Sequence, residues 1–213
     1  MITAASNSRI KRLVQLNQKS KLRRTEDVFL AEGVKMFLEA PREQLQEVYV
    51  SESFLEKCSC REHLEEVGYE VVSDSVFSKI SDTCTPQGVL CVLKQFHYNI
   101  EEMLRDKAPL FLLLENIQDP GNLGTMLRTG EGAGVSGIIM SRDTVDLYNP
   151  KVIRSTMGSI YRVPFYYADD FAAAVHQVQR AGVSVYAAHL RGKNSYACQD
   201  YTCLLYTSDA ADD

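Results

Sequence analysis

Residues 119–129, Asp-Pro-Gly-Asn-Leu-Gly-Thr-Met-Leu-Arg-Thr, contain the polar side chains whose types and spacing best suit chemistry. The two of greatest interest are Asn122 and Arg128. A guanidinium can bind a phosphate through two parallel hydrogen bonds and can favour a developing negative charge. Because it stays protonated it is a poor base, so a chemical role of Arg128 would be electrostatic. Asn122 could position Arg128 or a substrate, or it could only form a turn or helix cap before Leu123.

The elements around this segment predict where it lies in the fold. A continuous apolar run at 110–114 is typical of a strand buried on both faces. A turn cluster at 119–122 follows, then a helix with apolar side chains on one face, then another apolar strand at 138–140. Ligands of open α/β sheets bind outside the carboxyl ends of strands. The sequence therefore predicts a site where the first strand meets the helix.

Three glycines, Gly132, Gly134 and Gly137, match the G-x-G-x-x-G pattern of dinucleotide-binding proteins. That pattern binds a pyrophosphate only when it follows a strand and opens a helix. Here the order is reversed, because the glycines close a helix and lead into a strand. We interpret them as helix-ending residues that allow close packing, which argues against a nicotinamide or flavin site.

The segment 119–129 resembles the first motif of the SpoU/TrmH RNA 2′-O-methyltransferases, in the SPOUT class of knotted methyltransferases. The family has an Asn, a Gly two residues later and an Arg six residues after the Asn, matched by Asn122, Gly124 and Arg128. The resemblance implies methyl transfer from S-adenosylmethionine to a ribose 2′-hydroxyl, with Arg128 and Asn122 as catalytic residues. It also implies RNA, ribosomal RNA in particular, as the partner, and a homodimer in the complete protein.

Residues 149–158, Asn-Pro-Lys-Val-Ile-Arg-Ser-Thr-Met-Gly, begin a second helix, with Pro150 suited to its first turn. This phrase is similar to a helix-opening motif of the same family. The resemblance implies that Arg154 and Ser155 contact the RNA substrate.

The net charge of −5 argues on its face against a nucleic-acid partner, but the charge is unevenly distributed. Residues 1–24 contain seven basic and no acidic side chains, which leaves 16 basic and 28 acidic residues for the rest. Such a polarised chain can present a local phosphate-binding face. A charge run alone is usually a solvated face; the acid-free composition and the resemblance favour RNA phosphate contacts. The stretch has no aromatic residue, which argues against base stacking there.

Residues 1–95 alternate strands and helices and can form one small α/β domain. Within it we expect a helix at 7–17, a loop at 18–24 and one charged helix at 52–66. Four phrases are similar, in order, to the L30-like substrate-binding domain of the family: Asn7 to Leu13, Lys19 to Arg24, Phe29 to Lys35 and Thr85 to Gly88. The resemblance implies RNA-binding roles for Arg9, Lys11, Arg12, Lys21, Arg23, Arg24 and Glu32. Glu32-Gly33 could equally be only a helix start.

The predicted fold is therefore α/β. It comprises an N-terminal L30-like substrate-binding domain at 1–95, a linker at 96–108 and a SPOUT (α/β knot) methyltransferase domain at 109–203. We expect the last domain to be incomplete, because the family's late phrases, which form the knot and most of the cofactor pocket, are absent after a predicted strand at 182–188. Cofactor-binding residues thus stay unassigned. The acidic residues 204–213 are interpreted as a foreign tail after a C-terminal truncation.

No stretch is apolar and long enough for a membrane span, and the first residues lack a secretory signal. We therefore expect a cytoplasmic protein without a membrane partner. The six cysteines form no C-x-x-C pair and have no histidine at metal-ligand spacing, so we expect no metal site. Two hypotheses remain: an RNA 2′-O-methyltransferase, or a non-catalytic RNA-binding protein with an L30-like module on a remnant methyltransferase domain.

Overall fold

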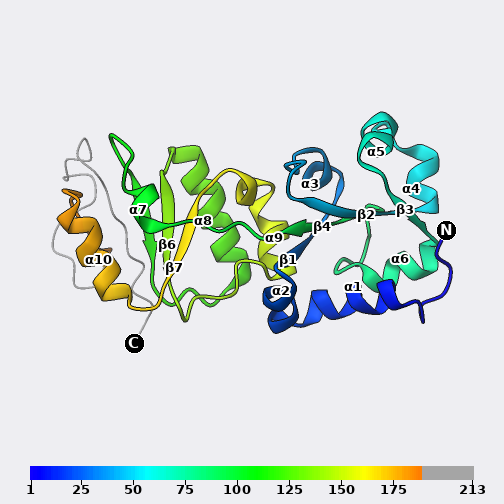
Figure 1. The fold of residues 1–213 in the computed structure, drawn as a ribbon, viewed down its shortest axis with the longest axis horizontal. Helices are drawn as coiled ribbons and strands as arrows, with labels where there is room; N and C mark the ends of the chain where they lie inside the picture. The colour runs from blue at the N-terminus through cyan, green and yellow to red at the C-terminus, as the bar shows by residue number, and fades with distance from the viewer. Residues whose placement is uncertain (189–213) are drawn as a thin grey trace. The chain divides into compact units, whose positions relative to one another are not determined.

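The computed structural model describes residues 1–188, and the chain divides into two compact units (Figure 1). The first unit is Met1–Phe96 together with Asp146–Tyr161, and the second is His97–Val145 together with the residues from Arg162 onward. In residues 1–96 helices and strands alternate as expected. They are α1 (Ser8–Gln18), α2 (Ser20–Glu26), β1 (Val28–Glu32), α3 (Val34–Leu38), β2 (Leu45–Ser51), α4 (Glu52–Lys57), α5 (Arg61–Val67), β3 (Glu70–Val72), α6 (Asp74–Ile80) and β4 (Val89–Lys94).

The four strands of the first unit form one mixed sheet in the order β1-β4-β2-β3. β4 pairs antiparallel with both β1 and β2, whereas β2 pairs parallel with β3. Parallel neighbours need a crossover connection, and α4 and α5 lie in the connection between β2 and β3. β1 and β3 are therefore the edge strands of this sheet.

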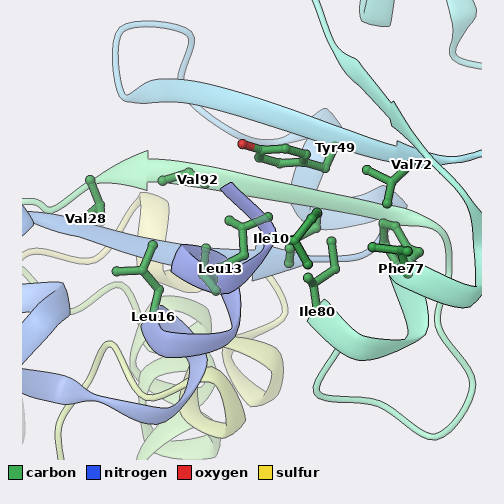
Figure 2. Packing of buried hydrophobic residues seen from close by; sticks show 12 residues of the cluster. Ile10, Leu13, Leu16, Val28, Tyr49, Val72, Phe77, Ile80 and Val92 are labelled. Carbon is green, nitrogen blue, oxygen red and sulfur yellow. The ribbon is translucent and has the colours of Figure 1, made fainter. Parts of the chain in front are cut away.

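Helices α1 and α6 cover one face of this sheet and bury its main apolar cluster (Figure 2). Leu30 of β1 and Val92 of β4 are register partners, and both side chains belong to the cluster. Ile10 and Leu13, three positions apart on α1, belong to the same cluster, together with Phe77 of α6. This spacing is that of the apolar stripe on an amphipathic helix, so the pattern that predicts α1 also builds the core.

Residues 146–161 pack with the first unit and form α9 (Pro150–Thr156) and the 3-10 turn η1 (Ser159–Tyr161). Helix α9 packs against β1, which has a strand partner on one side only (Figure 1). The Tyr148 ring lies 4.9 Å from the Phe29 ring, and the Tyr148 hydroxyl donates to the Phe96 carbonyl at 2.9 Å. Because an uncovered edge strand invites unwanted pairing, this segment helps to complete the first unit.

The second unit contains the strand–loop–helix–strand arrangement that the sequence predicts. Within the described residues its three strands are all parallel, in the order β5-β6-β7, and α10 packs on the sheet. Ile139 of β6 is buried with Leu113 of β5 and Val178 of α10. The elements are α7 (Ile100–Met103), β5 (Phe111–Leu114), α8 (Pro120–Ala133), β6 (Gly137–Ser141), β7 (Phe165–Ala168) and α10 (Phe171–Arg180).

The glycine-rich stretch closes a helix, as expected. Gly134 is the C-cap of α8 in the left-handed conformation, with φ of 74°, and its N–H donates to the Glu131 carbonyl at 3.0 Å. Glycine reaches this conformation without the steric cost of a side chain. The next glycine of the pattern, Gly137, opens β6, so the stretch does not present a helix N-terminus to a dinucleotide.

Three local predictions are wrong. Residues 20–26 form α2 instead of a loop, since lysine, leucine and arginine are good helix formers. The helix expected at 52–66 is broken into α4 and α5 around Cys58, which has extended backbone. Residues 183–187 form no strand: Val183 is buried as its apolar character suggests, but burial alone does not supply a ladder partner. The expected knot and the proposed tail at 204–213 lie outside the described residues.

Within residues 1–188, no helix combines the length and the apolar character that crossing a membrane requires.

Candidate active site and nucleic-acid interface

The loop after β5 leads directly into α8, the helix that carries Asn122 and Arg128. Asp119 is the N-cap of this helix, and its Oδ1 accepts the Asn122 backbone N–H at 2.7 Å. Pro120 follows at the first helical position, where a missing N–H has no cost. The interpretation of Asn122 as the helix cap is therefore wrong, because Asp119 takes that position.

The loops that follow β5 and β6 are fastened to each other at the carboxyl edge of the parallel sheet. Ser141, the last residue of β6, accepts the Asn116 N–H at 2.8 Å, and the Ile117 carbonyl accepts the Val145 N–H at 2.8 Å. Asn116 has a positive φ of 55°, a conformation that costs free energy in a residue other than glycine. Gln118 adds a hydrogen bond of 2.7 Å from its side chain to the Asp143 carbonyl. These bonds hold the start of α8 in a fixed orientation.

Arg128 is an exposed cation on α8. Its side chain has no hydrogen-bond or ion-pair partner within residues 1–188. The nearest acid along the helix, Glu131, is bonded to Arg162 instead, so it does not neutralise Arg128. Arg128 lies six positions after Asn122 on the helix, which corresponds to about 240° of rotation and about 9 Å along the axis. The two side chains therefore leave the helix on different faces, and Asn122 does not position Arg128 directly.

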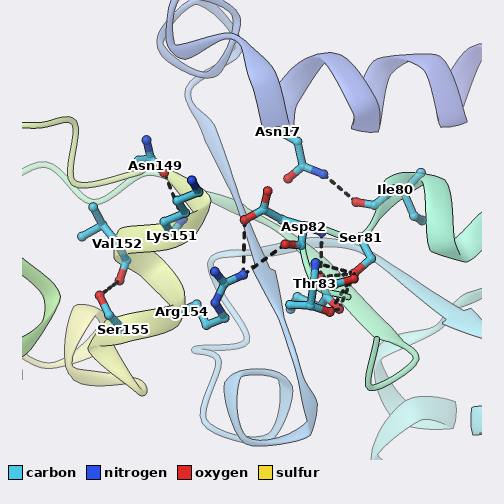
Figure 3. Close-up of polar contacts among 11 residues, drawn as sticks. Asn17, Ile80, Ser81, Asp82, Thr83, Asn149, Lys151, Val152, Arg154 and Ser155 are labelled. Atoms are coloured by element: carbon cyan, nitrogen blue, oxygen red, sulfur yellow. Dashed lines mark hydrogen bonds and ion pairs between the residues drawn. The ribbon is translucent and has the colours of Figure 1, made fainter. Parts of the chain in front are cut away.

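The second predicted motif lies in the first unit, on α9 (Figure 3). Asn149 caps this helix by accepting the Lys151 N–H at 2.9 Å, and Pro150 occupies the first turn as predicted. Arg154 is exposed and donates to the carboxylate of Asp82 at 3.2 Å. The Ser155 hydroxyl donates to the Val152 carbonyl within its own helix at 2.8 Å.

Arg23 does not present its charge to solvent. Its side chain is 3% exposed and makes an ion pair with Asp146 at 2.6 Å. The same guanidinium donates to the carbonyls of Leu16 and Asn17 at 2.7 and 3.2 Å, near the end of α1, where helix carbonyls lack intrahelical partners. This burial argues against the expected RNA contact of Arg23, since its Nη1 and Nη2 donors already serve the fold, while its buried Nε–H has no partner among the described residues.

Arg9 and Arg12 are also engaged, although they are less buried. Arg9 pairs with Glu70 at 2.6 Å, and Arg12 pairs with Glu26 and Glu47, each at 2.7 Å. Three carboxylates therefore surround two guanidinium groups, so this cluster is not a net positive patch.

Glu32 is likewise occupied. Both of its carboxylate oxygens accept the Ser81 hydroxyl, at 2.8 and 2.9 Å, and one accepts the Thr83 hydroxyl at 3.0 Å. Glu32 thus ties the end of β1 to the turn at 81–83. Gln87 fastens the neighbouring turn, because its side-chain oxygen accepts the Val34 N–H at 2.9 Å.

The remaining predicted cations of the N-terminal segment are exposed. Lys11 lies on α1, and Lys21 and Arg24 lie on α2, with no acidic partner among the described residues. Lys19, between the two helices, is exposed as well. These side chains form the part of the basic segment that a phosphate backbone can reach.

Comparisons with known proteins identify related families for both halves of the chain. Residues 109–207 match the family model of the SpoU rRNA Methylase family, and residues 7–91 match that of the MRM3-like substrate binding domain. The chain is 31% identical over 198 residues to the 23S rRNA (guanosine(2553)-2′-O)-methyltransferase RlmP of Bacillus subtilis. That alignment covers 92% of this chain and 75% of the relative. The chain belongs to the SpoU methylase family.

One further relative in sequence and one solved structure support the same comparison. The human mitochondrial rRNA methyltransferase 3 is 41% identical over 88 residues, which span 39% of this chain and 21% of that protein. The AdoMet-bound rRNA methyltransferase of Sinorhizobium meliloti is similar in structure, with a TM-score of 0.79 and 27% identity. The similarity covers 97% of this chain and 79% of that structure. The predicted family and fold class are confirmed.

The predicted cofactor is S-adenosylmethionine, which the Sinorhizobium meliloti structure binds, but the loop after β5 does not identify the residues that hold it in this chain. The backbone N–H groups of Asn116 and Ile117, at the carboxyl edge of the sheet, are already bonded to Ser141 and Thr144. The Gln118 side chain is bonded to Asn116 and to the Asp143 carbonyl. The polar groups of this loop hold the edge together, and the residues that bind the cofactor stay unassigned.

Proposed function

We propose that this chain is an S-adenosylmethionine-dependent RNA 2′-O-ribose methyltransferase that acts on ribosomal RNA. The observation that carries the proposal is the exposed Arg128, which has no ion-pair partner within residues 1–188, on a helix whose start is fixed at the carboxyl edge of a parallel sheet. Membership of the SpoU family and similarity to RlmP, an rRNA 2′-O-methyltransferase, support it.

In this proposal Arg128 acts by charge. Transfer to a 2′-hydroxyl needs an oxygen whose negative charge develops as its proton leaves, and a positive group nearby favours that state. Arg128 also binds the adjacent phosphate through its fork of N–H donors and so fixes the reacting ribose. S-adenosylmethionine supplies the activated methyl group. Asn122, which faces away from Arg128 on α8, contacts the ribose, and the 2′-hydroxyl distinguishes RNA from DNA.

The first unit binds the RNA backbone in this proposal, and the exposed cations Lys11, Lys21 and Arg24 make the phosphate contacts. Arg9 and Arg12 contribute only if their ion pairs open, and Arg23 is left out because it is buried. Glu32 and Ser155 support this surface through the bonds described above. Domain limits at 1–95 and 109–203, dimerisation of the complete protein and a cytoplasmic location stay predictions.

The test is methylation of rRNA by this chain with labelled S-adenosylmethionine, followed by alkaline hydrolysis. A 2′-O-methyl group blocks cleavage at the modified nucleotide, so label in alkali-resistant dinucleotides is the expected result. Label in mononucleotides would indicate base methylation and contradict the proposal. A chain that binds rRNA but transfers no label would support the non-catalytic RNA-binding alternative.

A further inference from the structure

Arg154, the cation of the second motif, already has an anion beside it. Its Nη1 lies 3.2 Å from a carboxylate oxygen of Asp82 and 3.3 Å from the Asp82 carbonyl oxygen (Figure 3). The pair is open to solvent, with side-chain exposures of 47% for Arg154 and 33% for Asp82. The contact uses one guanidinium nitrogen, so it lacks the two parallel bonds of a strong arginine–carboxylate pair.

The turn that carries Asp82 is held in place by β1. Glu32, at the end of that strand, accepts the Asp82 N–H at 3.2 Å and the hydroxyl groups of Ser81 and Thr83. Three neighbouring residues thus converge on one carboxylate. This arrangement fixes the backbone of the turn but leaves the Asp82 side chain bonded only to Arg154 within the described chain.

A second cation lies beside this pair. Lys151 precedes Arg154 by three residues on α9, so the two side chains lie on neighbouring parts of the helix surface. Lys151 is exposed and has no acidic partner in residues 1–188. Arg154 and Lys151 carry two positive charges, and Asp82 together with Glu32, which lines the same hollow, carries two negative charges. Without the Asp82 charge the group has one net positive charge.

The space beside the pair is small. Asn17, Glu32, Asp82, Pro150 and Arg154 contribute to the lining of a hollow of about 20 Å³. That volume holds about one water molecule and is too small for a phosphate group. An anion that reaches the inner side of Arg154 must therefore displace the Asp82 carboxylate.

We propose that Asp82 occupies, in the free protein, the position of an RNA phosphodiester at Arg154, and that bound RNA displaces it. The site is a phosphate subsite formed by Arg154 and Lys151, and Asp82 is its built-in competitor. This inference rests on the proposed RNA-binding function. The phosphate can accept from both nitrogens of the guanidinium fork, whereas Asp82 accepts from one. The competitor lowers affinity for every RNA, so only RNA held by further contacts opens the pair.

The test is binding of a fluorescein-labelled RNA hairpin of fixed sequence, followed by fluorescence anisotropy. Asp82→Asn removes the competing charge and keeps a side chain of the same shape, and we expect binding about three- to tenfold tighter than wild type at low salt. In an Arg154→Ala background the same substitution should change affinity less than about twofold, because the displaced pair no longer exists. The matched control is Glu66→Gln, which removes an acid from the exposed pair with Arg42 in the same unit.

Each outcome decides one claim. If Asp82→Asn leaves affinity unchanged, or tightens binding equally with and without Arg154, Asp82 is not a competitor at that residue. If Asp82→Asn weakens binding while the thermal melt is unchanged, Asp82 contributes to binding and the inference is overturned. If wild-type protein does not bind the hairpin at all, the RNA-binding function itself fails, a result distinct from the first two.

Discussion

Two neighbouring arginines, Arg23 and Arg24, should affect different properties when each is replaced by alanine: Arg23 the stability of the first unit, and Arg24 the binding of RNA. Arg23 is 3% exposed, pairs with Asp146 and donates to two carbonyls of α1. Arg24 is exposed, and within residues 1–188 its side chain makes a single long hydrogen bond, of 3.4 Å to Ser20. The same chemical change therefore removes a buried network in one case and a solvated charge in the other.

The cost of Arg23→Ala follows from these contacts. Each lost hydrogen bond to a carbonyl costs about 1 kcal/mol, and the ion pair costs about as much because Asp146 is partly solvated. We expect a loss of about 3 kcal/mol in the free energy of unfolding of the first unit. With a urea dependence of about 1.5 kcal/mol per molar, the midpoint should fall by about 2 M. Arg24→Ala should shift it by less than about 0.3 M.

Cys91 offers a readout of this unit. It is fully buried in β4, at the centre of the first sheet, and becomes available to a thiol reagent when that sheet unfolds. Labelling of Cys91 across a urea series, quantified by mass spectrometry, gives the midpoint for each variant.

RNA binding gives the complementary result: Arg24→Ala should reduce the salt slope of the affinity by about one unit. Equal midpoints for the Arg23 and Arg24 variants would refute the assignment of Arg23 to the fold.

Three further predictions concern the described contacts. Asp119→Ala should destabilise the second unit by about 1 kcal/mol through loss of the α8 cap, measured by urea denaturation, whereas Asp119→Asn should largely preserve it. Glu32→Gln should destabilise the first unit by about 1–3 kcal/mol, because the amide NH₂ group would then lie opposite other hydrogen-bond donors. An unchanged urea midpoint of Cys91 labelling would contradict the role of Glu32 in holding the turn at 81–83. Burial raises the pKa of the Cys91 thiol, so at pH 8 Cys91 should stay protonated and unlabelled in native protein while exposed Cys84 reacts.

Much of the second unit could be predicted from local pattern. Nearby residues alone predict three of its features. These are the buried strand at 110–114, the helix start at Asp119 and Pro120, and the glycine that ends α8. Asn122 shows the limit of such reasoning: it is a good capping residue, but Asp119 lies three positions earlier and takes the cap.

Which basic side chains of residues 1–24 are buried or paired could not be predicted in this way. Composition shows that residues 1–24 are positive, but the burial of Arg23 depends on Asp146, which lies 123 residues later in the chain. Arg154 is matched by Asp82, 72 residues earlier, and nothing near Asp82 in the sequence marks it as the partner. Lys151 could have been noticed, because a base three residues before Arg154 lies on the same part of the helix surface.

The central claim is that Arg128 stabilises the developing negative charge on the ribose oxygen. The most direct measurement is the single-turnover rate of methyl transfer to rRNA for wild type, Arg128→Ala and Arg128→Lys, with Arg105→Ala as an exposed-arginine control in the same unit. We expect Arg128→Ala to lower the rate by about 100- to 1,000-fold and to change RNA affinity less than about threefold. Arg128→Lys should recover part of the rate, since it keeps the charge but not the fork. Turnover by Arg128→Ala at the wild-type rate would contradict the claim.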